Sequence, residues 1–432
     1  MEHLSLERSV GIWGGAGRLP AERCVGRGDG EAAKGVAATV AAVGAPDARW
    51  ARVVLAPAAV TTACVLPSFL LGAMAVQVRR DLDFGASGIG LAFGMFFLAA
   101  SAASAVGGRI AERIGAVPAM RVAGLISGVA SLAVAATARS FATLLLPLAV
   151  AGAANAVCQP AANLLIARAV PAHRQGVGFA IKQSAIPMAT LLAGFAVPSL
   201  ALTLGWRWAY VVAAVLALGT LPLVPSSAAL ALPSAPAAAG REHGRQADVP
   251  WGLMALLSIG IAFGAAAGGT LGSFLVSAAV DTGISESRAG LLLTAGSLAG
   301  ITVRLAAGAR ADRHHDHLRV VALMLALGAG TFALLATGQP WAYVVAGPAG
   351  FCTAWAWPGL FNLAVVQANP SHPAAATGIT QTGTYIGAVS GPLLFGVLAE
   401  HTSYPLAWLV AAAFALMSAA LMSASDSRLS PT

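Results

Sequence analysis

The chain has 432 residues, of which 58% are hydrophobic and only 10% are charged, and its formal net charge is +8. Soluble globular proteins carry about 25% charged residues, so this composition excludes a long soluble domain and is typical of a chain that lies mostly in lipid. The basic excess does not indicate nucleic-acid binding, because Lys and Arg collect in the cytoplasmic loops of membrane proteins. The four cysteines form no CxxC pair, and we predict neither a disulfide framework nor a metal site.

Residues 1–51 are rich in Gly, Ala and Arg, and they lack both a periodic apolar pattern and the apolar core of a signal peptide. We expect a disordered cytoplasmic tail there. From Arg52 onward, apolar runs long enough to cross a bilayer core, about 20 residues each, recur between short polar breaks. The runs predict twelve transmembrane helices, at 53–76, 87–107, 117–138, 141–167, 175–204, 207–224, 251–280, 289–307, 319–337, 341–366, 374–399 and 405–424.

The longest polar break separates six predicted helices from the other six. Residues 226–250 are rich in Pro, Ser and Ala, which indicates a flexible linker. The sequence therefore predicts an N-terminal six-helix bundle at 52–225, a C-terminal six-helix bundle at 251–425 and a short tail at 426–432. Outside the N-terminal tail, basic residues gather mainly in the loops on the same side as the N-terminus. This distribution predicts that both termini and the linker are cytoplasmic.

One loop pattern occurs in both halves of the sequence. The loop after the second predicted helix reads Gly108-Arg-Ile-Ala-Glu112-Arg113-Ile-Gly115, and the loop after the eighth reads Gly308-Ala-Arg-Ala-Asp312-Arg313. We expect Gly108 and Gly308 to let neighbouring helices pack closely. The acids, Glu112 and Asp312, can accept hydrogen bonds from nearby helix ends or arginines when this end of the protein is closed.

A second pattern places aromatic residues at the start of the last helix of each half, in Trp206-Arg-Trp-Ala-Tyr210 and in Tyr404-Pro-Leu-Ala-Trp408. Two six-helix halves that share a glycine-acid-basic loop resemble the major facilitator superfamily, whose loop pattern is GxxxD[RK]xG. The second loop has His315 in place of the last glycine, and the first has Glu112 in place of the aspartate.

This resemblance covers about residues 52–425. It implies an all-α integral membrane protein made of two pseudo-symmetric six-helix bundles. It also implies a secondary transporter, a monomer without a cofactor, that works by alternating access around a central site.

Polar residues inside the predicted spans are costly in lipid and are therefore candidates for substrate binding. In the superfamily, the helices that carry them line the central cavity. Each amide alone is equally well explained by a hydrogen bond that joins neighbouring helices. The candidates are Asn155 and Gln159 in the fourth predicted helix, Lys182 and Gln183 in the fifth, Arg304 in the eighth, Trp355 and Asn362 in the tenth, and Gln381 and Tyr385 in the eleventh.

Two of these candidates are cations. Lys182 lies about 10 Å inside its helix, deep for an end residue although lysine can snorkel. Arg304 lies nearer the inner face, where it could simply reach the headgroups. In monocarboxylate and nitrate porters of the superfamily, an arginine four residues before the loop glycine of the eighth helix binds the anion, as Arg304 stands before Gly308. The second-helix arginine of the nitrate family corresponds to Ser104, which argues against nitrate.

All Asp and Glu residues fall in tails, loops or helix ends, so the counter-charge for the two cations is expected to arrive with the substrate. A planar guanidinium suits a carboxylate. We therefore hypothesise transport of a small organic anion, such as a carboxylate, across the cytoplasmic membrane, with a proton as a possible co-substrate. The alternative is proton-coupled efflux of drugs or metabolites, although the GxxxGP signature of such exporters is absent from the fifth helix.

An enzyme is not predicted, because the spans carry no Ser/His/Asp set, HExxH or paired acids. His314, His315, Asp316 and His317 form the densest group of possible metal ligands. We interpret them as a solvated cytoplasmic loop rather than a metal site.

Overall fold

The computed structural model describes residues 48–170, 175–225, 251–311, 314, 316–369 and 373–429. The predicted linker, most of the predicted tails, and Asp312, Arg313 and His315 of the second loop lie outside the described residues. The compact unit that holds the helices begins at Ala48.

Twelve helices in the described part of the chain are long and apolar enough to cross a membrane, which confirms the prediction from the apolar runs. All regular secondary structure among the described residues is helical. The elements are α2 (Ala48–Ala73), α3 (Ala75–Leu82), α4 (Ala86–Ile114), α5 (Ala116–Thr137), α6 (Phe141–Ala169), α7 (Gln175–Gln183), α8 (Ala185–Ala196), η2 (Val197–Ala201), α9 (Trp206–Thr220), η3 (Leu221–Leu223), α11 (Trp251–Asp281), α12 (Glu286–Ala311), α13 (His317–Leu335), α14 (Pro340–Thr353), α15 (Pro358–Ala368), α16 (Pro373–His401) and α17 (Tyr404–Leu429).

The fifth and tenth spans are interrupted, which the sequence analysis did not predict. In the fifth span α7 ends at Gln183 and α8 begins at Ala185, and in the tenth span α14 ends at Thr353 and α15 begins at Pro358. Each break has a proline beside it, Pro187 in the fifth span and Pro358 in the tenth. Proline has no backbone N–H, so it removes one hydrogen bond from the helical ladder.

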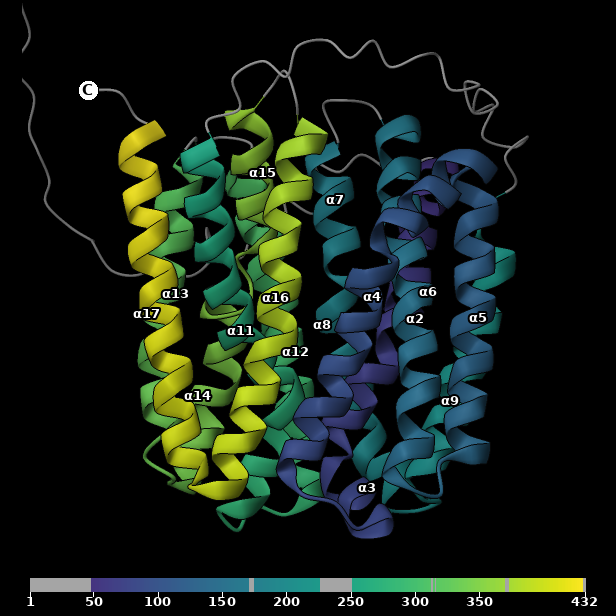
Figure 1. Ribbon diagram of the computed structural model, residues 1–432, viewed down its shortest axis with the longest axis vertical. Helices are drawn as coiled ribbons and strands as arrows, with labels where there is room; N and C mark the ends of the chain where they lie inside the picture. Colours follow the sequence, from purple (N-terminus) through teal and green to yellow (C-terminus); the bar gives the residue numbers. More distant parts are fainter. Residues whose placement is uncertain are drawn as a thin grey trace, which may run out of the picture. The chain divides into compact units, whose positions relative to one another are not determined.

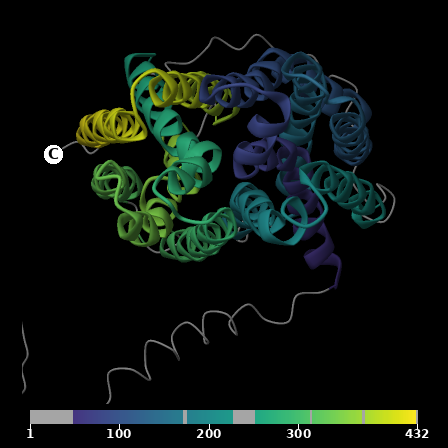
Figure 2. The ribbon, with the colours of Figure 1, turned by 90° about the horizontal axis from the view of Figure 1, so that it is seen from below.

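Elements α2 to η3 form one six-span bundle, and α11 to α17 form a second bundle beside it (Figure 1). Figure 2 shows the purple-to-teal helices of the first bundle on one side and the green-to-yellow helices of the second on the other. The bundles meet mainly through α4 with α16, α8 with α12, and α2 with α11. Below, the end at which η3 finishes and α11 begins is called the linker end, and the opposite end, which carries α3, is called the α3 end.

The two bundles pack most closely toward the α3 end, where glycines face the backbone of the other bundle. A Cβ atom on Gly90 would lie 2.3 Å from the carbonyl oxygen of Pro392, and a Cβ atom on Gly194 would lie 2.6 Å from that of Gly290. Any larger residue would have to move the partner helix. Small residues at such crossings let membrane helices come into backbone contact.

Carboxylates join the bundles at the surface of the α3 end. Glu286, in the first turn of α12, accepts hydrogen bonds from Gln77 at 2.6 Å and from Arg80 at 2.5 Å, both from α3. Glu400, near the end of α16, accepts the backbone N–H of Ser87 at 2.7 Å, at the start of α4. The α3 end is therefore closed by polar contacts as well as by helix packing.

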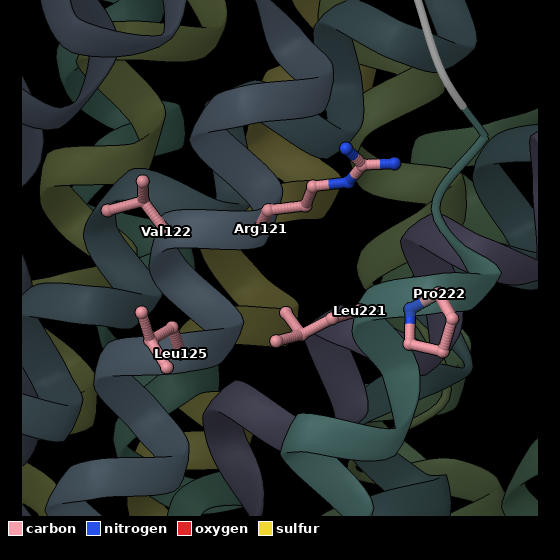
Figure 3. Close-up of a pocket in the computed structure, with 5 residues that line it drawn as sticks. All are labelled: Arg121, Val122, Leu125, Leu221 and Pro222. Atoms are coloured by element: carbon pink, nitrogen blue, oxygen red, sulfur yellow. The ribbon is translucent and has the colours of Figure 1, made fainter.

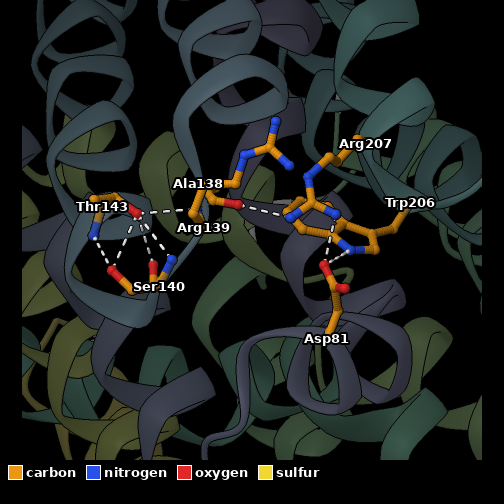
Figure 4. A network of polar contacts seen from close by, with 7 residues as sticks. All are labelled: Asp81, Ala138, Arg139, Ser140, Thr143, Trp206 and Arg207. Carbon is orange, nitrogen blue, oxygen red and sulfur yellow. Dashed lines mark hydrogen bonds and ion pairs between the residues drawn. The ribbon is translucent and has the colours of Figure 1, made fainter.

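The first bundle has its own polar network at the α3 end (Figure 4). The Asp81 carboxylate accepts hydrogen bonds from the Trp206 indole at 3.1 Å and from Arg207 at 2.5 Å, and Arg207 also donates to the carbonyl oxygen of Ala138 at 2.8 Å. Partial burial alone would raise the pKa of Asp81, but the hydrogen bonds from Arg207 and Trp206 outweigh it and hold that pKa below its ordinary value.

The aromatic pattern that the two halves share lies where the sequence predicts it. Tyr210, in α9, is buried and donates to the carbonyl oxygen of Pro67 at 3.1 Å. Trp408, in α17, is buried and donates to the Tyr343 hydroxyl at 2.9 Å. Both side chains anchor the last helix of their bundle to an earlier helix of the same bundle.

The loop glycines differ from each other at the linker end. A Cβ atom on Gly308 would lie 3.3 Å from the Cβ of Ala180, a close approach of α12 to α7. The expected close packing at Gly108 is wrong, since a Cβ there meets nothing within 4 Å. Its neighbour Gly107 approaches α6 instead, where a Cβ would lie 2.5 Å from the carbonyl oxygen of Ala156. Consecutive helical residues point about 100° apart, so only one glycine of the pair can face α6.

Candidate functional site

The Arg304 side chain lies between the two bundles. Its Nη1 donates to the Gln183 carbonyl oxygen in the first bundle at 2.9 Å, and its Nη2 donates to the Trp355 carbonyl oxygen in the second. Only 6% of the residue is exposed. The idea that Arg304 merely reaches toward the headgroups is therefore wrong, because its guanidinium is held inside the protein.

Both acceptors of Arg304 are backbone oxygens at the two helix breaks. In a continuous helix the Gln183 oxygen would accept the N–H of residue 187, but Pro187 has none. In the same way Pro358 leaves the Ala354 oxygen without its helical donor, and the Trp357 indole N–H occupies it at 2.7 Å. The chain between Thr353 and Pro358 is not helical, so the Trp355 oxygen is available to Arg304. Discontinuous helices commonly present such free backbone groups at transporter binding sites.

Lys182 ends a chain of polar side chains inside the first bundle. Its ammonium donates to Gln159 Oε1, and Gln159 Nε2 donates to Asn155 Oδ1 at 3.3 Å. Lys182 and Asn155 are 3% and 2% exposed. The structure thus joins three of the predicted site residues, and it places the fourth-helix amides on one face, as their spacing predicts.

Lys182 and Gln183 are adjacent in the chain but contact different bundles. The Lys182 side chain turns toward α6 within the first bundle, while the Gln183 carbonyl meets Arg304 from the second. Among the described residues, no carboxylate lies within 4 Å of either cation. Their acceptors are neutral oxygens, although a buried charge is normally paired with an opposite charge because its desolvation is costly.

Aromatic side chains surround this region from both bundles. The centroid of the Trp355 ring lies 5.6 Å from that of Phe69 in the first bundle and 5.2 Å from that of Phe351 in the second. Tyr385, on α16, is half-buried.

Two predicted residues do not join these groups. Asn362 is half-buried and Gln381 is exposed, and neither has a hydrogen-bond partner among the described residues. Sequence reasoning also missed a buried contact between the bundles, where the hydroxyls of Thr190 and Ser297 lie 2.6 Å apart. Threonine and serine are common in membrane helices, so their identity alone carried no signal.

The fold has close counterparts among solved structures. A D-xylose-proton symporter superposes with a TM-score of 0.71 at 14% identity, covering 87% of this chain and 97% of that one. A bacterial homologue of the human lysosomal transporter Spinster, in an inward-facing and occupied conformation, superposes with a TM-score of 0.66 at 18% identity, covering 89% and 98%. At these low sequence identities, the superpositions show that the fold is shared and no more.

Sequence comparisons identify relatives as well. Two proteins of Mycobacterium tuberculosis, from strains CDC 1551 / Oshkosh and ATCC 25618 / H37Rv, are both described as uncharacterized MFS-type transporters and are 33% identical over 144 residues. The match spans about a third (32%) of this chain and of each relative. The family model of the Major Facilitator Superfamily matches residues 58–266 and 257–429, which together take in nearly all of both bundles. With its twelve spans and two six-helix bundles, the chain therefore belongs to the major facilitator superfamily and is a membrane transporter rather than an enzyme.

Proposed function

We propose that this transporter moves a small organic anion, most simply a carboxylate, by alternating access, and that Arg304 is the group that binds the anion. The observation that carries this proposal is the buried Arg304 guanidinium, which bridges the two bundles through neutral carbonyl oxygens. A carboxylate would supply the negative charge that these acceptors lack. Arginine and carboxylate also match in shape, because two N–H groups can donate in parallel to two oxygens.

The position of Arg304 couples binding to movement. Its bond to Gln183 connects α12 of the second bundle to the fifth span of the first. Any motion that separates the bundles at this level breaks that bond and leaves a buried donor and a buried acceptor unpaired, at about 1–3 kcal/mol for each group. A bound anion can occupy the donors of Arg304 in their place. The substrate thus lowers the cost of the conformational change.

The remaining predicted residues support the rest of the substrate in this proposal. Lys182 is a second cationic group, held ready by Gln159 and Asn155. Trp355 and Tyr385 supply aromatic surface on the second bundle. The proposed further contacts with substrate are the side chains of Gln183, Asn362 and Gln381.

The loop residues at the linker end form the gate in this proposal. They are Gly108, Glu112 and Arg113 in the first half, and Gly308, Asp312 and Arg313 in the second. We further propose that the linker end faces the cytoplasm, that the protein is a monomer in the cytoplasmic membrane, and that a proton accompanies the anion. The fold of the D-xylose-proton symporter is compatible with such coupling. A reporter fused to the C-terminus tests the orientation, and a protonophore added during uptake tests the coupling.

Uptake of radiolabelled monocarboxylates and dicarboxylates into proteoliposomes tests the central proposal. We expect saturable uptake of at least one carboxylate by the wild type. Arg304→Ala is expected to abolish it. Arg304→Lys is expected to reduce kcat/KM by at least tenfold, because lysine keeps the charge but cannot donate to two oxygens in parallel. An assay with substrate on either side of the membrane distinguishes uptake from efflux.

Arg288→Ala is the matched control, because Arg288 is an exposed arginine in the same helix, α12. It should transport like the wild type. The proposal is contradicted if Arg304→Ala and Lys182→Ala both retain full carboxylate transport, or if uncharged compounds alone are transported.

A further inference from the structure

A hollow of about 410 Å³ lies on the first bundle near the linker end, between α5 and the end of the sixth span (Figure 3). It is lined by Arg121, Val122, Leu125, Leu221 and Pro222. Arg121 is the one charged group among them. Every other lining side chain is apolar, so the hollow combines a single positive charge with an apolar wall.

The charge is fixed at the rim of this hollow. Arg121 lies in the second turn of α5, and its Nη2 donates to the Val224 carbonyl oxygen at 2.9 Å. The Val224 oxygen is available because it follows the last helical turn of the sixth span. The guanidinium is exposed, and among the described residues it has no other hydrogen-bond acceptor and no carboxylate within 4 Å. Most of its donors are therefore open to a ligand.

An apolar stripe continues along α5 away from this charge. Val122, Leu125, Val129 and Leu132 are between 42% and 55% exposed. Their spacing of three and four residues places them on one face of the helix. At 1.5 Å per residue the stripe runs about 16 Å from Arg121 toward the α3 end. Such an exposed face within a transmembrane helix suits a hydrocarbon chain.

The floor of the hollow is closed by tight packing between α5 and the sixth span. A Cβ atom on Gly124 would lie 3.0 Å from Leu221, and a Cβ atom on Gly128 would lie 3.2 Å from Leu218. These glycines bring the leucines against α5.

We propose that this hollow and the apolar stripe beside it bind one phospholipid with an anionic head group, whose phosphate contacts Arg121 and whose acyl chain lies along the Val122–Leu132 stripe. A water-soluble anion would use the guanidinium but leave the apolar wall uncovered. A zwitterionic lipid would cover the wall but gain less from the charge. Only an anionic amphiphile satisfies both parts of the site, in keeping with the attraction of basic residues near a membrane surface for anionic lipids.

Native mass spectrometry of the delipidated full-length transporter tests this site. The probes are phosphatidylglycerol and phosphatidylcholine with identical acyl chains, and glycerol 3-phosphate as the soluble head-group analogue. We expect the wild type to bind phosphatidylglycerol more tightly than phosphatidylcholine. Arg121→Ala should reduce this preference about fivefold, the effect of one basic residue near the surface, whereas Arg121→Lys should keep most of it.

Arg319→Ala is the matched control, because Arg319 is an exposed arginine near the start of α13 at the same end of the protein. It should leave the lipid preference unchanged. Leu125→Ser should weaken the binding of both lipids, since it interrupts the stripe. The proposal is overturned if Arg121→Ala and Arg319→Ala lower the preference equally, or if glycerol 3-phosphate displaces phosphatidylglycerol at equal concentration. Thermal unfolding without added lipid shows whether each variant is folded.

Discussion

Arg304 in the second bundle donates a hydrogen bond to the Gln183 carbonyl oxygen in the first, and Pro187 is the reason that this oxygen is free. Arg304, Gln183 and Pro187 together make this contact. The proline removes a donor from its own helix, the carbonyl turns to the other bundle, and the arginine binds it there. This contact between the bundles thus depends on Pro187, a residue whose own carbonyl oxygen bonds within the first bundle, to Thr190.

Replacing Pro187 with alanine should change transport of the anion without lowering the stability of the protein. The new N–H at position 187 would compete with Arg304 for the Gln183 oxygen. We expect the KM for the anion to fall about three- to tenfold, because the anion would no longer compete with the Gln183 oxygen for a hydrogen bond worth about 0.5–1.5 kcal/mol. Thermal stability should stay equal or increase, because alanine is far better tolerated than proline within a helix. Proteoliposome uptake and thermal unfolding measure the two effects.

Pro147→Ala provides the comparison, because Pro147 lies inside α6, toward the α3 end and away from the Arg304 contacts. It should change stability without changing the KM. An unchanged KM in Pro187→Ala would show that the Gln183 oxygen does not compete with the anion for Arg304.

The polar chain in the first bundle makes a different prediction. Gln159→Leu removes the acceptor of a buried ammonium, and we expect it to lower the free energy of unfolding by about 1–3 kcal/mol. The double variant Lys182→Met/Gln159→Leu removes the charge as well, so it should recover much of this loss. Transport should not recover with it. Additive destabilisation in the double variant would show that Lys182 and Gln159 are not coupled.

The apolar runs were sufficient to predict twelve spans and two six-helix halves, because burial in lipid demands long uninterrupted apolar segments. They did not predict the breaks at Ser184 and between Thr353 and Pro358. The apolar run continues through the second break, and the polar residues 182–184 at the first fall inside a longer run that predicts one continuous span. The spacing of Asn155 and Gln159 correctly predicted a shared face. The partners of Arg304 could not be predicted, because both are backbone oxygens whose availability depends on packing between distant helices.

Gly90 offers a test of closure at the α3 end. In Gly90→Val the new side chain would meet the Pro392 carbonyl, so α4 and α16 could not approach each other as they do in this structure. We expect the population to shift toward a form that is open at the α3 end. The distance between spin labels attached to the α3 ends of α4 and α16 should increase, and transport should slow because closure at this end is one step of the proposed alternating-access cycle.

Gly219→Val is the control for this experiment, since a Cβ atom at Gly219 in α9 meets nothing within 4 Å. It should leave both the distance and the transport rate unchanged. Equal label distances in the wild type and Gly90→Val would contradict the assignment of this contact to closure.

The ion pair at the linker end allows a prediction about pH. Arg310 donates two hydrogen bonds to Asp316, at 2.7 and 2.9 Å, and they lower the pKa of Asp316 to about 2. The ordinary value is about 3.9, so the folded-state pKa lies below the unfolded one. The contribution of this contact to stability is therefore complete above about pH 4 and is lost as the pH falls toward 2. Because the pair is exposed, its contribution is small.

Asp316→Asn should consequently have a slightly lower melting temperature than the wild type, by an amount that is constant from pH 8 to pH 5. The difference should disappear as the pH approaches 2. Between pH 5 and 8 the carboxylate stays ionised, so the shape of the uptake profile over this range should be the same in both proteins. Asp426→Asn, in α17, controls for removing a carboxylate that has no ion pair among the described residues. A shift of the uptake profile in Asp316→Asn alone would show that this carboxylate takes part in proton coupling, and that its pKa during transport lies far above the value set by Arg310.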